Sequence, residues 1–343
     1  MSTPFRLPSK RSPMVAPILR SWRALTGGNT VRDRDRPTIV ACSGGADSTA
    51  LALALASAGG LAALAHIVHD LRPKAQTHAD RDAVRDLAQR LGVPFLEASV
   101  RARRAAGNTE AAARRLRYAA LARLARQAGL SLVATAHHAD DQLETVLMRL
   151  IRGAGPRGLS GVQPARPIAP GVRLIRPCLS VTREDLEALC RSCGEPWRTD
   201  PTNADTSMTR AALRAEVLPV LRRLASGAAT NAARSATRCA DAAGFMTRSA
   251  VRLRRRATTE RRGGIERLDR AMLRRVPPAV IAELFRVLAK DRPGRDRMPA
   301  SSLAAVSSAV RDRVGGDRAF TIGPLRISLT RDALHVKRYA VRP

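Results

Sequence analysis

The sequence predicts an α/β fold, with a parallel sheet that carries helices on both faces, followed by a smaller helical domain and a short β-rich tail. Three observations lead to this prediction. Through about residue 145, apolar segments of strand length alternate with longer segments of helical periodicity, which is the order of a parallel sheet with crossover helices. From about residue 226 the chain becomes rich in alanine and arginine at helical spacing. After residue 311, short alternating segments are typical of strands.

The elements of the alternating region follow one another closely. A leading helix with apolar residues at helical spacing is expected at 14–25. We expect strands at residues 38–42, 62–68, 94–100 and 131–136. We expect helices at residues 48–57, 79–91 and 110–128, the last two ending at glycine. Ligands of such sheets bind at the carboxyl ends of the strands, so functional residues should follow the strands directly.

Composition suggests four parts. They are a basic tail at 1–13, the α/β domain at 14–225, a basic helical domain at 226–310 and a β segment at 311–343. Residues 1–13 contain no acid, which is typical of a disordered tail, the interpretation we favour, and also of a transit peptide. The chain has no run of 18 apolar residues, so we expect no membrane span.

The charge balance points to a polyanionic partner. Sixty basic residues face 29 acidic ones, and the formal net charge is +31. Genomic base composition can favour arginine over lysine, but it does not account for the scarcity of carboxylates. Nucleic acid is therefore the leading candidate, with arginine suited to bidentate contacts with phosphate. Aromatic residues make up only 3%, which argues against a row of stacking platforms for single strands.

A glycine-serine turn after the first expected strand is the strongest local signal. Two consecutive glycines let the backbone approach a ligand closely, and the following helix directs its free N–H groups at the turn. The turn lacks the Gly-Lys-Ser/Thr ending of a Walker loop and the spacing of a dinucleotide fingerprint. The sequence predicts a phosphate site formed by Ser43, Gly44, Gly45, Ala46, Asp47 and Ser48.

Two histidines and three carboxylates follow a later strand, in the segment 137–145. Asp141 and Glu144 lie three residues apart and share one helix face, and carboxylate oxygens are ligands that Mg²⁺ prefers. Asp140 or Asp141 could equally cap the helix that follows. A zinc hydrolase is disfavoured because no further ligand set has a recognisable spacing. This segment should face the same pocket as the glycine-serine turn.

Both segments resemble the tRNA(Ile)-lysidine synthases, a family of PP-loop N-type ATP pyrophosphatases. The likeness covers about residues 14–225 and rests on several independent motifs. The matching stretches are residues 43–48, 110–118, 136–145, 149–155, 158–161, 176–183 and 197–219. One departure is Ala211, which stands after Arg210 where the family usually has asparagine.

The resemblance implies an ATP-dependent ligase that acts on tRNA(Ile) with a CAU anticodon. In this family, ATP adenylates the C2 oxygen of the wobble cytidine, and the ε-amine of L-lysine then displaces AMP to give lysidine. The product changes codon specificity from AUG to AUA and amino acid identity from methionine to isoleucine. The resemblance further implies Mg²⁺, a cytoplasmic location and a tRNA partner, and it leaves a homodimer open.

The same resemblance assigns roles to residues. ATP binding falls to the turn from Ser43 to Ser48, and Mg²⁺ or the lysine ammonium to Asp47, Asp141 and Glu144. His137 is a candidate acceptor for the amine proton, although a hydrogen bond to backbone or phosphate is the favoured use. Arg114 and Arg117 lie three residues apart on one helix face, where they could neutralise phosphate, the use we favour, or form a solvated surface. The candidate tRNA contacts are Arg210, Arg214, Arg252, Arg254 and Arg255.

Two other functions remain open. Cys190 and Cys193 form a Cys-x-x-Cys pair, and PP-loop tRNA thiolases use cysteines for sulfur chemistry near the ATP site. Packing of small thiols in a helix explains the pair more simply, since five scattered cysteines fit reduced thiols. A basic RNA-binding protein without catalysis is the other alternative, and the carboxylates at Asp47, Asp141 and Glu144 argue against it.

Overall fold

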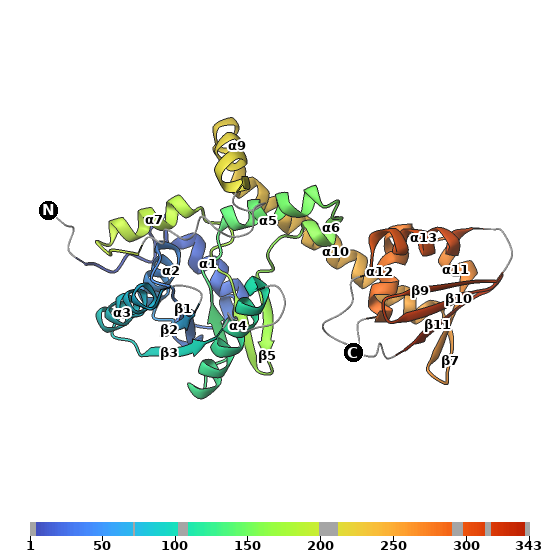
Figure 1. The fold of residues 1–343 in the computed structure, drawn as a ribbon, viewed down its shortest axis with the longest axis horizontal. Helices are drawn as coiled ribbons and strands as arrows, with labels where there is room; N and C mark the ends of the chain where they lie inside the picture. The colour runs from blue at the N-terminus through green and yellow to red at the C-terminus, as the bar shows by residue number, and fades with distance from the viewer. Residues whose placement is uncertain are drawn as a thin grey trace. The chain divides into compact units, whose positions relative to one another are not determined.

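The computed structural model describes residues 5–70, 73–101, 109–198, 212–289, 298–312 and 317–339. The chain forms two compact units, Met1–Arg238 and Cys239–Pro343, here called the N-terminal and C-terminal units (Figure 1). The division falls within helix α10 (Ala228–Ala257). None of the helices in the described ranges is long and apolar enough to cross a membrane.

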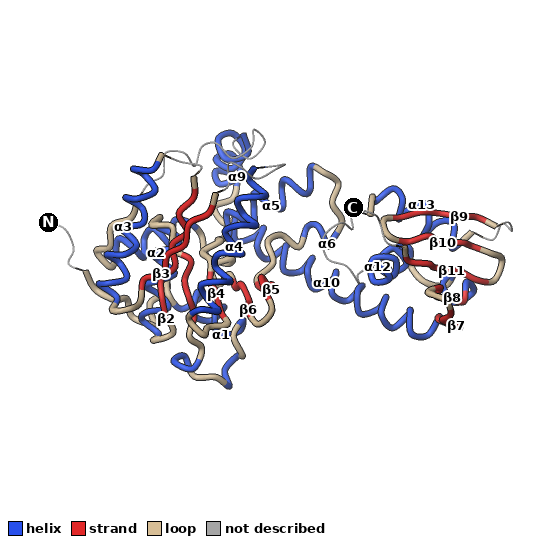
Figure 2. The backbone as a smooth tube through the Cα atoms, turned by 60° about the horizontal axis from the view of Figure 1, so that its bottom comes forward, coloured by secondary structure: helices blue, strands red, loops and turns tan. Residues whose placement is uncertain are grey.

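The N-terminal unit contains a six-stranded sheet (Figure 2). Its strands are β1 (Thr38–Ala41), β2 (Leu61–His69), β3 (Phe95–Val100), β4 (Leu132–Ala134), β5 (Ala165–Ala169) and β6 (Val172–Ile175). The strand order is β3-β2-β1-β4-β6-β5, and only β5 pairs antiparallel with its neighbour. The predicted parallel sheet is confirmed. The β5–β6 hairpin turns at Gly171, with φ of 73°, and was not expected because arginine and proline interrupt its apolar pattern.

Helices surround this sheet. They are α1 (Ala16–Leu25), α2 (Ala46–Ala58), α3 (Lys74–Leu91), α4 (Thr109–Gln127), α5 (Ala139–Ile151), α6 (Pro156–Leu159), α7 (Arg183–Ser192), the π-helical turn η4 (Leu213–Val217) and α9 (Leu218–Leu224). The predicted helices are confirmed with small shifts of their ends. The largest shift is at α3, which begins five residues before the expected start at 79.

Neighbouring residues of β1 show that both faces of the sheet are buried. Val40 packs with the apolar residues of α1, α2, α3 and α7, whereas Ile39 packs on the opposite face with those of α4. Successive strand residues point to opposite faces, so a strand covered on both sides reads as a continuous apolar run. This arrangement leaves the carboxyl edge of the sheet for the polar segments.

The C-terminal unit combines helices with a second sheet. Beyond α10 it contains β7 (Thr258–Arg262), β8 (Ile265–Asp269), α11 (Arg270–Arg274), α12 (Pro278–Ala289), α13 (Ala300–Arg311), β9 (Arg318–Ile322), β10 (Leu325–Leu329) and β11 (Ala333–Arg338). The antiparallel sheet has the order β7-β8-β11-β10-β9. The expected strands near the end of the chain are confirmed.

The structure does not separate the segments 226–310 and 311–343, which the composition suggested as two parts. Strands β7 and β8 lie inside the segment 226–310, which we expected to be helical, and β8 pairs with β11 from the segment 311–343. The two segments therefore share one sheet. Gly263 and Gly264 form the β7–β8 turn with φ of 58° and 76°, and the charged residues of β7 conceal its strand pattern.

Arg270 is a buried cation in the C-terminal unit, with 1% of its surface exposed. Its guanidinium donates to the carbonyl oxygens of Ala309, Val310, Asp312 and Thr330 at 2.6–3.2 Å. Three of these acceptors lie at the C-terminal end of α13, where helix carbonyls lack partners and carry partial negative charge. Arg270 thus caps α13 without a carboxylate.

Candidate active site

The glycine-serine turn lies at the carboxyl end of β1 and leads into α2. Gly44 has φ of 86°, a conformation that favours glycine. The Ser48 hydroxyl accepts a hydrogen bond from Ser43 N at 3.1 Å and donates to Gly45 O at 3.1 Å. These bonds fix the turn at the start of α2, where the first N–H groups of a helix lack partners within the helix. The turn therefore has the form of an anion cradle.

Two neighbouring segments hold this turn in place. Arg198 N donates to Gly44 O at 2.9 Å, and the Arg198 guanidinium contacts Asp80 of α3 at 3.2 Å. A side chain at Gly44 would have its Cβ 3.4 Å from Asp80 O and 3.5 Å from Arg198 Cγ. These are ordinary van der Waals distances, so the positive φ, and not crowding, explains glycine at this position.

The histidine-carboxylate segment lies at the carboxyl end of β4, next to β1. His138 N donates to Asp141 Oδ2 at 3.0 Å, which closes the first turn of α5. Asp141 thus serves as a cap, one of the two roles considered for it. The cap turns its carboxylate toward the His138 ring, so the same side chain takes part in a cluster of charges.

The His138 ring lies among three carboxylates, and we name His138, Asp47, Asp140 and Asp141 the His138 group. The Nε2 atom is 3.6 Å from both Asp47 Oδ2 and Asp141 Oδ2, and Nδ1 is 3.4 Å from Asp140 Oδ2. Burial lowers the pKa of His138, but Asp140, Asp141 and Asp47 outweigh it and raise that pKa to about 9. His138 is therefore an imidazolium at neutral pH. The sequence pattern did not single it out.

Asp47 has a carboxylate oxygen suited to a cation. Its Oδ1 atom is buried and has no hydrogen-bond partner in the described part of the chain. Burial raises the pKa of Asp47, with His138 opposing. The described residues include no group of three or more His, Cys, Asp or Glu side chains arranged to hold a metal. Mg²⁺ binds proteins through one or two carboxylates together with substrate phosphates, and Asp47 fits that use.

Glu144 and Asp140 tie α5 to later segments. Glu144 is 3% exposed, and its Oε1 accepts from Arg214 Nε at 2.5 Å. Asp140 accepts from Arg183 N at 2.9 Å and from Arg222 Nη2 at 2.8 Å. The three expected carboxylates are therefore not equivalent, since Asp47 and Asp141 share His138 whereas Glu144 is paired with Arg214.

His137 differs from His138 in its protonation state. Its Nδ1 atom lies 3.1 Å from Thr135 Oγ1. Burial lowers the pKa of His137 to about 3; Asp141 opposes this shift, and the charges of Arg176 and Arg114 add to it. His137 is consequently neutral at physiological pH and is a weak proton acceptor.

Four arginines surround the Tyr118 ring of α4, and we name Arg114, Arg117, Arg166, Arg176 and Tyr118 the arginine-tyrosine cluster. The guanidinium carbons of Arg114, Arg117 and Arg166 lie 5.6, 5.8 and 4.5 Å from the ring centroid. Arg176 Nη2 donates to the Tyr118 hydroxyl at 3.4 Å. Arg114 was expected near the site. Arg166 was missed because β5 was not expected, and Arg176 because its motif lay in unassigned sequence.

Two side chains of α5 hold the turn after α6. The Gln142 amide donates to Val162 O at 3.1 Å and accepts from Val162 N at 2.6 Å. Arg149 Nη1 donates to the carbonyl oxygens of Gly158 and Gly161 at 2.6 and 2.8 Å. These contacts account physically for the two motifs at 149–155 and 158–161, which support the site from outside it.

Comparison with known proteins agrees with this geometry. Residues 21–221, more than half of the chain, match the sequence profile of the PP-loop domain family. A tRNA(Ile)-lysidine synthase from Salinispora arenicola is 38% identical over 332 residues, which cover 92% of this chain and 94% of that relative. The chain belongs to the tRNA(Ile)-lysidine synthase family. A synthase from Thermus thermophilus is 42% identical over 218 residues, 62% of this chain, but the chain covers only 41% of that relative's length.

A solved structure supports the fold of this lysidine synthase family member. The U34-tRNA thiolase NcsA from Methanococcus maripaludis, with its [4Fe-4S] cluster, is similar with a TM-score of 0.51 and 17% identity. The match covers 66% of this chain and 78% of the thiolase. At this identity the likeness concerns the fold alone, and the thiolase is more distant than the curated synthases.

Four of the five cysteines of this family member are packing residues in the structure. Cys42, Cys178, Cys190 and Cys193 are buried in the core beneath α2. Cys190 Sγ donates to Ala46 O at 3.4 Å, and burial raises the pKa of this thiol well above its usual range. A protonated, buried thiol is a poor nucleophile and a poor metal ligand. The geometry gives the Cys190/Cys193 thiolase alternative no support.

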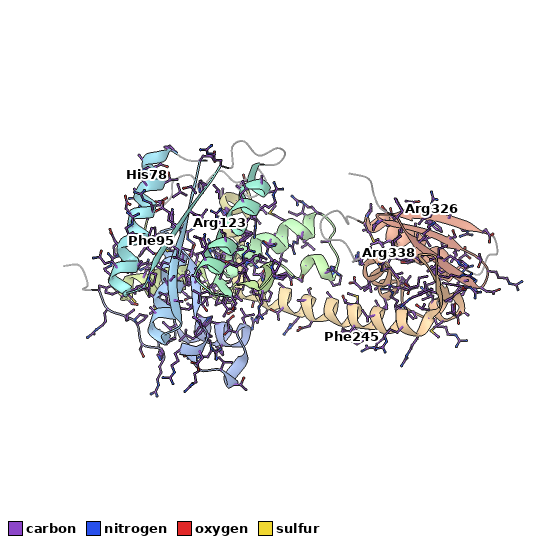
Figure 3. All side chains as sticks on the ribbon, turned by 90° about the horizontal axis from the view of Figure 1, so that it is seen from below. His78, Phe95, Arg123, Phe245, Arg326 and Arg338 are labelled. Carbon is purple, nitrogen blue, oxygen red and sulfur yellow. The ribbon has the colours of Figure 1, made fainter. Side chains whose placement is uncertain are left out.

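The expected tRNA-contact arginines have different surroundings. Arg210 lies outside the described residues. Arg214 is paired with Glu144, and Arg254 makes a two-bond contact with Glu266, at 2.8 Å from Nε and 2.6 Å from Nη2. Arg252 and Arg255 are exposed on α10. Figure 3 shows side chains along α10, with Phe245 labelled.

Proposed function

We propose that the protein ligates L-lysine to C2 of the wobble cytidine in CAU-anticodon tRNA(Ile), through an adenylated cytidine, and releases pyrophosphate and AMP. The observation that carries this proposal is the anion cradle of β1 beside the His138 group of β4. These two groups lie at one edge of the sheet, because β1 pairs with β4, and they would serve as the phosphate site and the cation site. The reaction forms a carbon–nitrogen bond and changes codon specificity from AUG to AUA.

The cradle would hold the phosphates of ATP. Backbone N–H groups and hydroxyls of Ser43, Gly44, Gly45, Ala46 and Ser48 supply the donors, and the positive end of α2 favours the anion. Asp47, assisted by Asp141, would hold Mg²⁺ against these phosphates. The ion would supply positive charge that stabilises pyrophosphate as it leaves.

The His138 group would also receive the lysine side chain. Because His138 already carries a proton, it cannot accept one from the lysine ammonium. His137 is neutral but weakly basic, which favours hydrogen bonding for this residue. Asp47 is the more basic carboxylate, since its pKa is raised whereas that of Asp141 is lowered, chiefly by His138 against the effect of burial. Since Asp47 would hold Mg²⁺, its carboxylate would pair with the ion and the lysine ammonium rather than accept the amine proton.

The exposed arginines Arg252 and Arg255 would contact the tRNA backbone. Arg254 and Arg214 would act indirectly, by holding Glu266 and Glu144. Contacts of this kind release counterions, so tRNA affinity should fall steeply with salt. The proposal places the reaction in the cytoplasm and includes a homodimer, which light scattering of the purified protein checks.

The test is ATP-dependent labelling of RNA. Purified protein is incubated with CAU-anticodon tRNA(Ile) transcript, Mg-ATP and radiolabelled lysine, and label is counted with and without ATP. Asp47→Asn should reduce incorporation by at least about 100-fold, the scale of losing one electrostatic contact to a transition state. Its tRNA affinity should stay nearly unchanged.

The matched control is Asp241→Asn, which removes an exposed carboxylate from α10 and should retain incorporation. Full activity of Asp47→Asn would exclude Asp47 from the mechanism. Absence of incorporation by wild-type protein, with AMP still released, would contradict the ligase and require a trial with a sulfur donor.

A further inference from the structure

The arginine-tyrosine cluster gathers four positively charged side chains around one phenol. In the described part of the chain, none of its arginines has a carboxylate within ion-pair distance. Elsewhere in the N-terminal unit, arginines find acids: Arg90 contacts Glu195 at 2.5 Å, and Arg222 contacts Asp140 at 2.8 Å. Within the described residues, the lack of a paired acid is therefore local to this cluster, where like charges repel one another.

Arg176 is kept beside the other arginines of the cluster by burial and by its hydrogen bonds, despite the repulsion between like charges. This residue is 2% exposed. Its Nη1 donates to Gln163 O at 2.5 Å and its Nη2 to Tyr118, while Nε is buried without a hydrogen-bond partner among the described residues. A buried cation is costly unless an anion or several acceptors surround it. Burial accordingly lowers the pKa of Arg176, and the charges of Arg114 and Arg166 lower it further.

The position of the cluster connects it with the candidate active site. Arg176 directly follows β6, which pairs with β4, the strand that leads to His137. The charges of Arg176, Arg114 and Arg117 help to lower the pKa of His137, so the cluster lies within electrostatic reach of that ring. Arg117 and Arg166 are exposed, which leaves the cluster open to a solute.

We propose that the arginine-tyrosine cluster binds an oxyanion of a substrate, either the α-carboxylate of lysine or a backbone phosphate of the tRNA. Guanidinium groups bind both with paired hydrogen bonds. Lysine carries an ammonium at one end and a carboxylate at the other, which matches the acidic His138 group and the basic cluster. This inference rests on the proposed function for the identity of the anion, and the test separates the two sources.

The experiment uses the double variant Arg117→Gln/Arg166→Gln, since both side chains are exposed and the fold should tolerate it. The KM for lysine, the dissociation constant for tRNA, and the activity with lysinamide, which lacks the carboxylate, are measured. If the anion is the carboxylate, wild-type protein prefers lysine to lysinamide by about tenfold or more, and the variant loses this preference. If it is a phosphate, the tRNA dissociation constant rises and the salt slope falls by about two.

The control is Arg123→Gln/Arg126→Gln, which removes two exposed charges from the same helix α4 outside the cluster; Figure 3 labels Arg123. The inference is overturned if the cluster variant and this control have equal lysine and tRNA dissociation constants, the lysine constants being measured by calorimetry. Wild-type protein that incorporates no lysine contradicts the proposed function instead, while the two binding measurements still decide the inference.

Discussion

The His138 group and the arginine-tyrosine cluster lie at one edge of the same sheet and have opposite net charge. In the first, three carboxylates surround one imidazolium at 3.4–3.6 Å. In the second, four guanidinium groups surround the phenol of Tyr118, and no carboxylate lies among them in the described residues. The acidic group has its own counter-ion, whereas the basic one has none among the side chains that the structure describes.

This difference in counter-ions determines how the stability of each group depends on a bound ligand. A group that contains its counter-ion is stable without a ligand, and its charge serves the fold as well as the chemistry. A group that lacks one depends on a solute for neutralisation, so its stability should rise when an anion binds. The two parts should therefore respond differently to mutation, pH and salt.

The largest effect is expected for His138→Gln. This change removes the positive charge between Asp47, Asp140 and Asp141 and leaves the carboxylates to repel one another. Breaking such a buried arrangement should lower the free energy of unfolding by about 4 kcal/mol, as measured by urea denaturation. His78→Gln, an exposed change on α3, is the control and should have little effect. Equal stability of both variants would show that His138 is not the counter-ion.

The two buried arginines Arg270 and Arg176 should differ in how much their replacement destabilises the protein. Arg270 has four carbonyl acceptors, so Arg270→Met should destabilise the protein by about 3 kcal/mol through the acceptors it leaves unpaired. Arg176→Met loses fewer bonds and relieves repulsion, so it should cost less than about 1 kcal/mol. Thermal unfolding measures both. A larger loss for Arg176→Met would mean that the cluster is satisfied within the fold.

Stability should depend on pH through His138. Because its pKa is raised in the folded state from 6.5 to about 9, its contribution is complete below pH 6.5 and is lost as the pH rises through 9. The free energy of unfolding should fall by up to about 1.4 kcal/mol per pH unit in this range. Urea denaturation between pH 6 and 9.5 checks the slope, which His138→Gln should abolish.

The smallest effect on turnover is expected for Cys190→Ser with Cys193→Ser. These thiols are uncharged and buried, and they belong to neither charged group. Replacing them should cost about 1 kcal/mol each through poorer packing, and lysine incorporation at saturating substrates should not change. Loss of turnover in a folded double variant would instead revive the thiolase alternative.

Much of the fold follows from local sequence, and part of the site does not. The apolar run of β1, the turn at Gly44 and Gly45, and the helix after it are local patterns, so the cradle could be placed beforehand. The His138 group and the arginine-tyrosine cluster depend on which strands become neighbours. Arg166 enters its cluster through β5, whose arginine and proline hide the strand pattern. Arg254 looked free because its partner Glu266 lies on a strand that the charged sequence concealed.

The side-chain amide of Gln142 takes the place of a backbone peptide group. Its amide presents one donor and one acceptor to Val162, as a neighbouring strand residue would. A Cβ at Gly161 would overlap Gln142 Oε1, so a side chain there would expel the amide that holds the turn. Gly161→Ala and Gln142→Ala both remove this interaction, so a double-mutant cycle should show that their costs add only in part. The remaining cost of Gly161→Ala comes from its backbone, since its φ is 63°. One interaction thus couples the stability effects of two positions on different segments.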